Sequence, residues 1–183
     1  MRSVREIILA RRSVRRYLPT PLSRETVEEL LEAGRYAPSG HNKQAWRFTA
    51  ILDQKLLQEL NQLVRAGFAA LALGEDAPKE LRDAKAKAER QGESYHFTYD
   101  APCLIIASND TSDPNAQASC ACALENMFLA ACEMGLGSCW VNQLHWLRDD
   151  LNLRKKLAEL GVPEAHTICG LSLIHISEPT RPY

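Results

Sequence analysis

The sequence predicts an α+β fold in which a sheet lies between layers of helices. Along the 183 residues, segments with helical periodicity and segments with strand-like alternation mix in no regular order, which argues against a repeated βαβ unit. The apolar share of 45% and the charged share of 25% are ordinary for a globular protein. A chain of this length predicts one domain with a core of its own.

The first part of the chain predicts two capped helices. Ser3 and Glu6 have the spacing of a capping box, so a short helix is expected to run to about Ala10. Ser23 is the expected cap of a second helix, whose apolar stripe has a helical period. That helix is expected to end before Pro38, because the residue before a proline disfavours the helical conformation.

The middle of the chain predicts a strand and two helices. Residues 46–52 alternate as a strand does, and apolar residues at helical spacing mark a helix over residues 54–73. Residues 77–92 are dense in charge and offer only Leu81 and small alanines as an inward face. This composition is typical of an exposed, mobile helix, although a lid over a cofactor is an alternative interpretation.

A buried strand and a long helix come next. Residues 101–108 form the predicted strand. Asp113 as cap and Pro114 at the first helical position predict the start of a helix that runs to Met134, where Gly135 ends it. This helix is rich in alanine, which suits either a buried central helix or close packing against a partner subunit.

The last part of the chain predicts two strands around one helix. Residues 138–142 are a short strand and residues 165–171 a closing strand. Between them, residues 149–160 predict a helix that Gly161 and Pro163 end.

Charge and targeting signals exclude several classes of function. The formal net charge of −1 gives no electrostatic case for binding nucleic acid or an anionic membrane. The apolar residues 7–10 are too few for a signal peptide or a membrane span. A cytoplasmic protein is therefore expected.

The cysteines predict neither a metal site nor disulfides. No pair of the six has C-x-x-C spacing, and Cys120 and Cys122 should point to different faces of a helix, so we expect no zinc site. Without a secretory signal, reduced thiols in apolar surroundings are the better interpretation.

An arginine-rich run follows the first predicted helix. It reads Arg-Arg-Ser-Val-Arg-Arg-Tyr over residues 11–17. In an extended segment Arg11, Ser13 and Arg15 share a face, and in a helix Arg11 and Arg15 still do. Two guanidinium groups and a hydroxyl suit a phosphate monoester, although arginine clusters are most often solvated surfaces.

A second run, Pro-Ser-Gly-His-Asn-Lys-Gln-Ala-Trp over residues 38–46, breaks the chain with Pro38 and Gly40 before the first strand. The amide side chains of Asn42 and Gln44 can donate to and accept from the polar edge of a heteroaromatic ring. By itself such a turn is most often only a connection. Together with the arginine run it suggests a nucleotide-like cofactor.

With a third run, Gly-Leu-Gly-Ser-Cys-Trp-Val-Asn-Gln-Leu over residues 135–144, the chain resembles the nitroreductase family of flavin mononucleotide (FMN) enzymes. The three runs occur in the order of that family, and the resemblance spans roughly residues 4–170. It implies a nitroreductase-like α+β fold, with a central mixed or antiparallel sheet flanked by helices, and an intertwined homodimer. Residues 1–170 would form the FMN-binding domain.

The resemblance also implies which residues bind FMN. The phosphate and ribityl chain would be held by Arg11, Arg12, Ser13 and Arg15. The opposite subunit would contribute Pro38, Ser39, Gly40 and Asn42. The segment along the isoalloxazine ring would be Trp140, Val141, Asn142 and Gln143, with a backbone N–H near Asn142 or Gln143 facing flavin N5. For Trp140 a core position is the alternative.

The implied activity is a ping-pong reductase, with NAD(P)H as co-substrate and nitroaromatics, quinones or related small molecules as electron acceptors. The flavin carries the chemistry, so no side chain is expected to act as a general acid. The sequence contains no G-x-G-x-x-G fingerprint, which agrees with a nicotinamide co-substrate that binds transiently and is then released. The alternatives are a specialised flavoenzyme of the same family (dehalogenation, azoline oxidation or flavin breakdown) and a non-enzymatic flavin-binding protein.

The C-terminal residues 171–183 depart from this resemblance. A nitroreductase would usually continue with a Gly-Tyr-Pro-like turn and a basic segment that reaches the FMN phosphate. Here the chain reads Leu-Ser-Leu-Ile-His-Ile-Ser-Glu-Pro-Thr-Arg-Pro-Tyr, which resembles the translation of a sequencing adapter. We therefore expect a non-native tail, a short natural C-terminus being the alternative. Residues 171–176 still alternate as a strand does, Arg181 is not expected to bind phosphate, and FMN binding should be weaker than with a family-type C-terminus.

Overall fold

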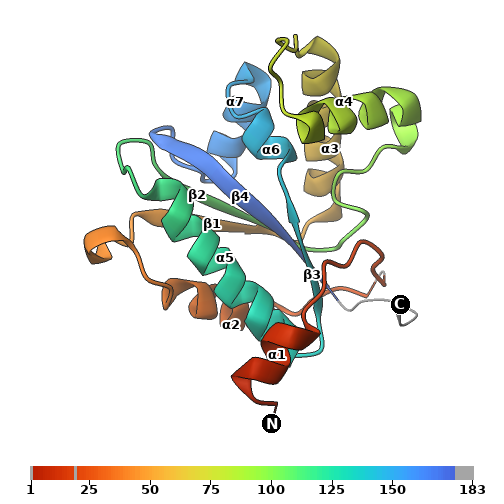
Figure 1. Cartoon of the computed structure of the whole chain (residues 1–183). Coiled ribbons are helices and arrows are strands. Elements are labelled where there is room, and N and C mark those ends of the chain that lie inside the picture. Colours follow the sequence, from red (N-terminus) through yellow and green to blue (C-terminus); the bar gives the residue numbers. More distant parts are fainter. Residues whose placement is uncertain (1, 19, 176–183) are drawn as a thin grey trace.

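Four strands form the sheet at the centre of the fold. The computed structural model describes residues 2–18 and 20–175, and in this part of the chain the strands are β1 (Trp46–Ile51), β2 (Leu104–Asp110), β3 (Gly137–Val141) and β4 (His166–His175). They lie in the order β1-β2-β4-β3, with β1 and β3 at the edges (Figure 1). Every neighbouring pair is antiparallel. Of the mixed and antiparallel sheets that the resemblance allowed, the protein therefore has the antiparallel one.

Helices cover one face of the sheet with the long α5 as their centre. The helices of this layer are α1 (Val4–Ala10), α2 (Arg24–Arg35) and α5 (Ala116–Glu133). Helix α5 crosses the sheet, and α1 and α2 pack against it (Figure 1). Leu124 and Met127 of α5 are fully buried with Ile105 and Ile174 of the central strands. Much of the alanine-rich, apolar surface of α5 is therefore accounted for by burial against the sheet.

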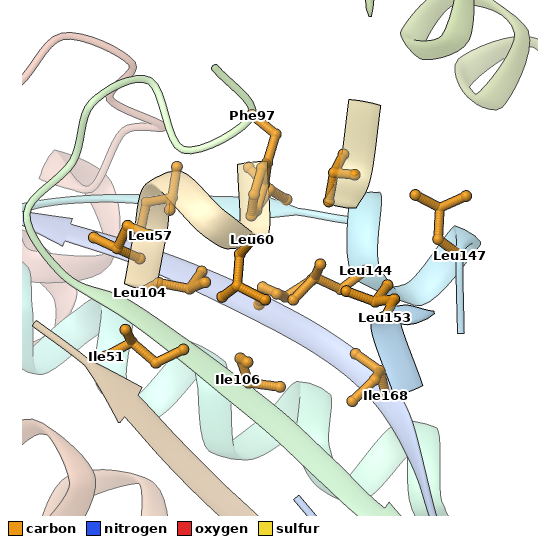
Figure 2. Close-up of a cluster of buried hydrophobic side chains, with 14 of the residues drawn as sticks. Ile51, Leu57, Leu60, Phe97, Leu104, Ile106, Leu144, Leu147, Leu153 and Ile168 are labelled. Carbon is orange, nitrogen blue, oxygen red and sulfur yellow. The ribbon is translucent and has the colours of Figure 1, made fainter. Parts of the chain in front are cut away.

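The other face carries the second helical layer. Its helices are α3 (Gln54–Ala70), α4 (Lys79–Gln91), α6 (Gln143–Trp146) and α7 (Leu151–Glu159). Figure 2 shows how Leu60 of α3 and Leu153 of α7 meet Ile106 and Ile168 of the sheet in one apolar cluster. These four side chains are fully buried, and such burial stabilises the fold by about 1.5–3 kcal/mol for each residue.

Helix α4 matches the charged helix predicted over residues 77–92. Leu81 packs against the core and Ala88 is buried, so the inward face is the one that the sequence indicated. Most charged side chains of α4 are exposed. Lys85 is an exception, because its Nζ donates to the Phe68 carbonyl of α3 at 2.5 Å. The mobility of this helix and a role as a lid stay predictions.

Most helix ends follow the predicted caps. Ser3 and Glu6 form the complete capping box, with Ser3 N–H donating to Glu6 Oε2 at 2.7 Å and Glu6 N–H to Ser3 Oγ at 3.3 Å. The Ser23 side chain caps α2. Gly135 follows α5 with a φ of +75°, a left-handed conformation that glycine adopts without strain.

The predicted start of α5 is wrong. The helix begins at Ala116 after Asn115, and not at Pro114 after Asp113. Asp113 belongs to the turn after β2, where its Oδ1 accepts from Asn115 N–H at 3.1 Å and lies 3.5 Å from Lys43 Nζ. Because this buried carboxylate is committed to the turn and to Lys43, it does not cap α5.

Strand β4 continues beyond the predicted closing strand. Residues 171–175 pair with β3, residues 171–173 also pair with β2 on the other side, and the whole segment is buried. The strand predicted over residues 171–176 is confirmed as far as His175. Residues 176–183, which include Arg181, lie outside the described residues, and the expectation of a non-native tail stays a prediction.

Two further features concern the described part of the chain only. None of its helices is both long and apolar enough to cross a membrane, and it holds no group of three or more potential metal ligands.

Cys120 is buried and Cys122 exposed, so the two thiols do lie on different faces of α5.

The contact between β4 and Trp140 generates a stability prediction. A Cβ on Gly170 would lie 2.4 Å from Trp140 Cζ2 and 2.9 Å from Leu124 Cδ1. Gly170→Ala should therefore lower the free energy of unfolding by about 1–3 kcal/mol through overpacking. Gly74→Ala is the matched control, because nothing lies within 4 Å of its Cβ position. Urea unfolding checks both variants, and equal midpoints would contradict the close contact.

Candidate functional site

The arginine run is held against the edge strand β3. After α1 ends, the chain is extended, and Ser13 forms an isolated parallel β-bridge with Ser138. Val14 N–H donates to the Ser138 carbonyl at 2.9 Å, and the Val14 side chain is buried while those of Ser13 and Arg15 are exposed. This alternation agrees with the predicted extended segment, in which Ser13 and Arg15 share the outward face.

The arginines of this run differ in their partners. Arg11 is half-buried, and its Nε lies 3.6 Å from Glu125 Oε1 of α5. Arg12 turns back on the end of α1, where its Nη1 donates to the carbonyls of Leu9 and Arg11 at 2.7 and 2.8 Å. The Arg12 guanidinium is thus engaged with the backbone.

The charges of Arg11 and Arg15 reach β3. Burial raises the pKa of the Cys139 thiol above its ordinary value, and the positive charges of Arg15 and Arg11 oppose this rise. Such an effect requires both guanidinium groups to lie near the strand. The arginine run therefore lies beside Cys139, in agreement with the bridge between Ser13 and Ser138.

The end of β3 is locked by hydrogen bonds. Trp140 Nε1 donates to Asn142 Oδ1 at 2.5 Å, and the indole ring packs edge-on against Phe128 with 6.3 Å between centroids. Asn142 N–H donates to Gln143 Oε1 at 3.1 Å, and Gln143 Nε2 donates to the Tyr95 hydroxyl at 3.3 Å. Val141 and Gln143 are buried and Trp140 and Asn142 half-buried. Trp140 is thus a packed aromatic, as the alternative predicted, and its place along an isoalloxazine ring stays a prediction.

The second run is a tight loop with unusual backbone angles. It contains the short helix η1 (Gly40–Asn42), in which His41 and Asn42 have φ values of +53° and +52°, and Gln44 has a φ of +48°. Ser39 Oγ accepts from Gln44 N–H at 3.0 Å, and Gln44 Nε2 donates to Asn42 Oδ1 at 3.1 Å. Non-glycine residues in the left-handed region cost free energy and occur often at functional sites.

One chain does not bring this loop to the other two runs. The loop leads into β1, and β1 and β3 are opposite edges of the sheet. In Figure 1 the loop (orange) protrudes on the side of the sheet opposite to β3 and to the arginine run. The structure thus joins the first and third runs and leaves the second apart.

A hollow opens beside the arginine run. It has a volume of about 520 Å³, and its walls include Arg15, Arg16 and Tyr17 on one side and Lys87 and Tyr99 on the other. Sequence reasoning did not identify Lys87, Tyr95 or Tyr99. The signal that could have indicated them is the charge density of residues 77–92, together with the tyrosines that follow.

Comparison with known proteins decides the family. The sequence profile of the Nitroreductase family matches residues 8–174. The chain belongs to this family. A crystal structure of a nitroreductase with bound FMN from Bacteroides fragilis is similar to it with a TM-score of 0.87 and 39% identity, over 100% of this chain and 92% of that one.

Two relatives support the assignment. A nitrobenzene nitroreductase from Ectopseudomonas oleovorans is 30% identical, over 92% of this chain and 84% of the relative. A putative NADH dehydrogenase/NAD(P)H nitroreductase from Archaeoglobus fulgidus is 26% identical, over 95% of this chain and 84% of the relative. The family, predicted from the three runs, and the α+β class, predicted from the mixed order of helices and strands, are both confirmed, and the assignment of individual FMN-binding residues stays a prediction.

The surroundings of Cys139 generate a prediction about reactivity. Alkylation requires a thiolate, and both burial and the raised pKa disfavour it. At pH 8 iodoacetamide should modify Cys139 about a hundredfold more slowly in the folded protein than in urea. Mass spectrometry of tryptic peptides measures both rates, and equal rates would contradict the packing of β3 described here.

Proposed function

We propose that this protein is an FMN-dependent oxidoreductase that uses NAD(P)H to reduce nitroaromatics, quinones or related acceptors. The observation that carries the proposal is the bridge between Ser13 and Ser138, because it joins the arginine run to the end of β3. The nitroreductase from Bacteroides fragilis, 39% identical, holds FMN in the same fold.

The donors gathered at β3 fit this cofactor. Arg11 and Arg15 provide charged forks and Ser13 an exposed hydroxyl, the groups that suit a phosphate and a ribityl chain. Arg12 would contribute after releasing its backbone contacts, or through its positive charge alone. The hydrogen-bonded segment of Trp140, Val141, Asn142 and Gln143 is rigid enough to fix a flavin ring.

The proposed site requires a second subunit. Pro38, Ser39, Gly40 and Asn42 lie at the opposite edge of the sheet, so a homodimer would supply them across the interface. Helix α1 offers an apolar surface for such an interface, because Val4, Ile8 and Leu9 are 70%, 54% and 57% exposed. Apolar side chains exposed together on one short helix are typical of a protein–protein contact.

The protein side of the reaction is positioning and electrostatics. When bound, FMN supplies hydride acceptance from NAD(P)H and electron transfer to the acceptor. The arginines would hold the anionic end, and the end of β3 would orient the ring through its backbone. The positive charge of Arg15 stabilises negative charge that develops nearby. One open face suffices for both substrates, so they would bind in turn.

A direct experiment tests this function. The purified protein, reconstituted with FMN under nitrogen, is mixed with NADH or NADPH, and the oxidised flavin absorbance should fall and return when an acceptor is added. A flavin that stays oxidised would favour the non-enzymatic alternative. Turnover restricted to a halogenated or azoline substrate would favour a specialised member of the family.

The arginine run generates a prediction for cofactor affinity. Arg11→Ala and Arg15→Ala should each weaken FMN binding by about 1.5–3 kcal/mol, or about ten- to a hundredfold in Kd, because a charge-assisted contact is lost. Quenching of flavin fluorescence measures the Kd. Arg24→Ala on α2 is the control, since its guanidinium is 84% exposed and pairs only with Glu28 within the described residues. Unchanged affinity in both test variants would remove the phosphate role.

The split site generates a second prediction. Arg11→Glu/Arg15→Glu and Ser39→Trp should each abolish FMN binding, the first by charge and the second by bulk in the loop. If the two regions meet across subunits, a refolded equimolar mixture should regain about a quarter of the wild-type sites, because half the dimers are mixed and each holds one intact site. Equilibrium dialysis counts the sites, and a mixture as inactive as its components would contradict the split site.

A further inference from the structure

The hollow beside the arginine run carries an unbalanced positive charge. Arg15, Arg16 and Lys87 line it, and among residues 2–18 and 20–175 none of the three forms an ion pair or a side-chain hydrogen bond. Asp100 also lines the hollow, but it is in close contact with His96. The hollow thus gathers three cations against the single carboxylate of Asp100, which favours an anionic occupant.

Other cations nearby show that this imbalance is local. Arg11 forms an ion pair with Glu125. Lys85 lies two residues before Lys87 on the same helix, and its Nζ pairs with Glu89 Oε1 at 2.7 Å. The Arg12 guanidinium donates hydrogen bonds to backbone carbonyls. The arginine run is therefore divided into a first half with partners in the fold and a second half that faces the hollow without them.

Tyrosine rings complete the hollow. Lys87 Nζ lies 5.0 Å from the centroid of the Tyr99 ring and 6.0 Å from that of Tyr95. Tyr99 and Asp100 have φ values of +50° and +58°, so Tyr99 is held by a strained backbone. On the other side, Tyr17 is fixed by the hydrogen bond from its hydroxyl to the Val14 carbonyl at 2.5 Å. Rings and cations together suit a flat molecule that bears a negative group.

The hollow is connected to the proposed flavin site. Arg15 belongs to both, since it lines the hollow and its charge acts on Cys139 of β3. Tyr95, whose ring faces Lys87, accepts a hydrogen bond from Gln143 at the end of β3. A molecule seated in the hollow would therefore extend from the place where the isoalloxazine ring is proposed to lie.

We propose that this hollow binds the carboxylate of an aromatic electron acceptor, with Arg16 and Lys87 as the residues that determine specificity. The inference rests on the proposed function and names the substrate class of that site. A volume of about 520 Å³ suits one small aromatic acid and is modest for a dinucleotide. The phosphate of NADPH is the other anionic group that could bind in this hollow. The experiment distinguishes binding of a carboxylate from binding of this phosphate.

The test compares an acid with its neutral isostere. Isothermal titration calorimetry of the FMN-loaded, oxidised protein measures the Kd of 4-nitrobenzoate and of 4-nitrobenzamide without any turnover. We expect the acid to bind about tenfold more tightly, and Lys87→Gln or Arg16→Gln to reduce this ratio about three- to tenfold. Lys79→Gln, an exposed lysine on the same helix, should leave the ratio unchanged. Raising the salt from 0.05 to 0.5 M should also reduce it.

The outcomes distinguish this inference from the proposed function. Equal affinities for acid and amide in a wild-type protein that binds FMN, and whose flavin NADH reduces, would overturn the carboxylate site alone. A selective rise in the KM for NADPH, and not for NADH, in Lys87→Gln, with the acid-to-amide ratio unchanged, would overturn it in favour of the nucleotide phosphate. A wild-type protein that does not retain FMN would instead contradict the proposed function.

Discussion

The site depends on one short backbone contact at the edge of the sheet. The bridge between Ser13 and Ser138, with the hydrogen bond from Val14 to the Ser138 carbonyl, fixes the chain after α1 on β3. Without it, the backbone of residues 13–14 would not be fixed on β3, and Ser13 and Arg15 would lose their defined place beside that strand. With it, guanidinium groups lie beside the rigid end of β3, where Trp140, Asn142 and Gln143 hold one another in place. Preorganisation of this kind lets a surface bind a cofactor rather than merely attract ions.

Sheet order then explains why one chain does not bring the three runs together. Because β2 and β4 occupy the centre, β1 and β3 become opposite edges, and the loop that precedes β1 is carried away from the arginine run. The loop keeps a strained conformation at His41, Asn42 and Gln44, which its own hydrogen bonds support. Strain at a protruding loop, far from the other family motifs, is understandable if the loop completes the site of a partner.

The sequence predicted most elements because their signals are local. Ser3, Ser23 and Gly135 act through contacts within a few residues, and so the ends they mark lie where expected. Asp113 was misplaced because a residue distant in sequence, Lys43, competes for its carboxylate. The same limit applies to the site. The arginine run and the segment after Cys139 were found as motifs, whereas Lys87 and Tyr99 meet Arg16 only through tertiary packing, which periodicity does not report.

The central claim is that FMN binds where the arginine run meets β3 and that the loop before β1 closes the same site. Hydrogen–deuterium exchange with and without FMN tests it most directly, because it reports all backbone segments at once. We expect FMN to slow exchange in residues 11–15, 138–143 and 38–44 together, with one FMN for each chain. Slower exchange confined to the α3 and α7 layer, or in the first two segments with none in residues 38–44, would contradict it.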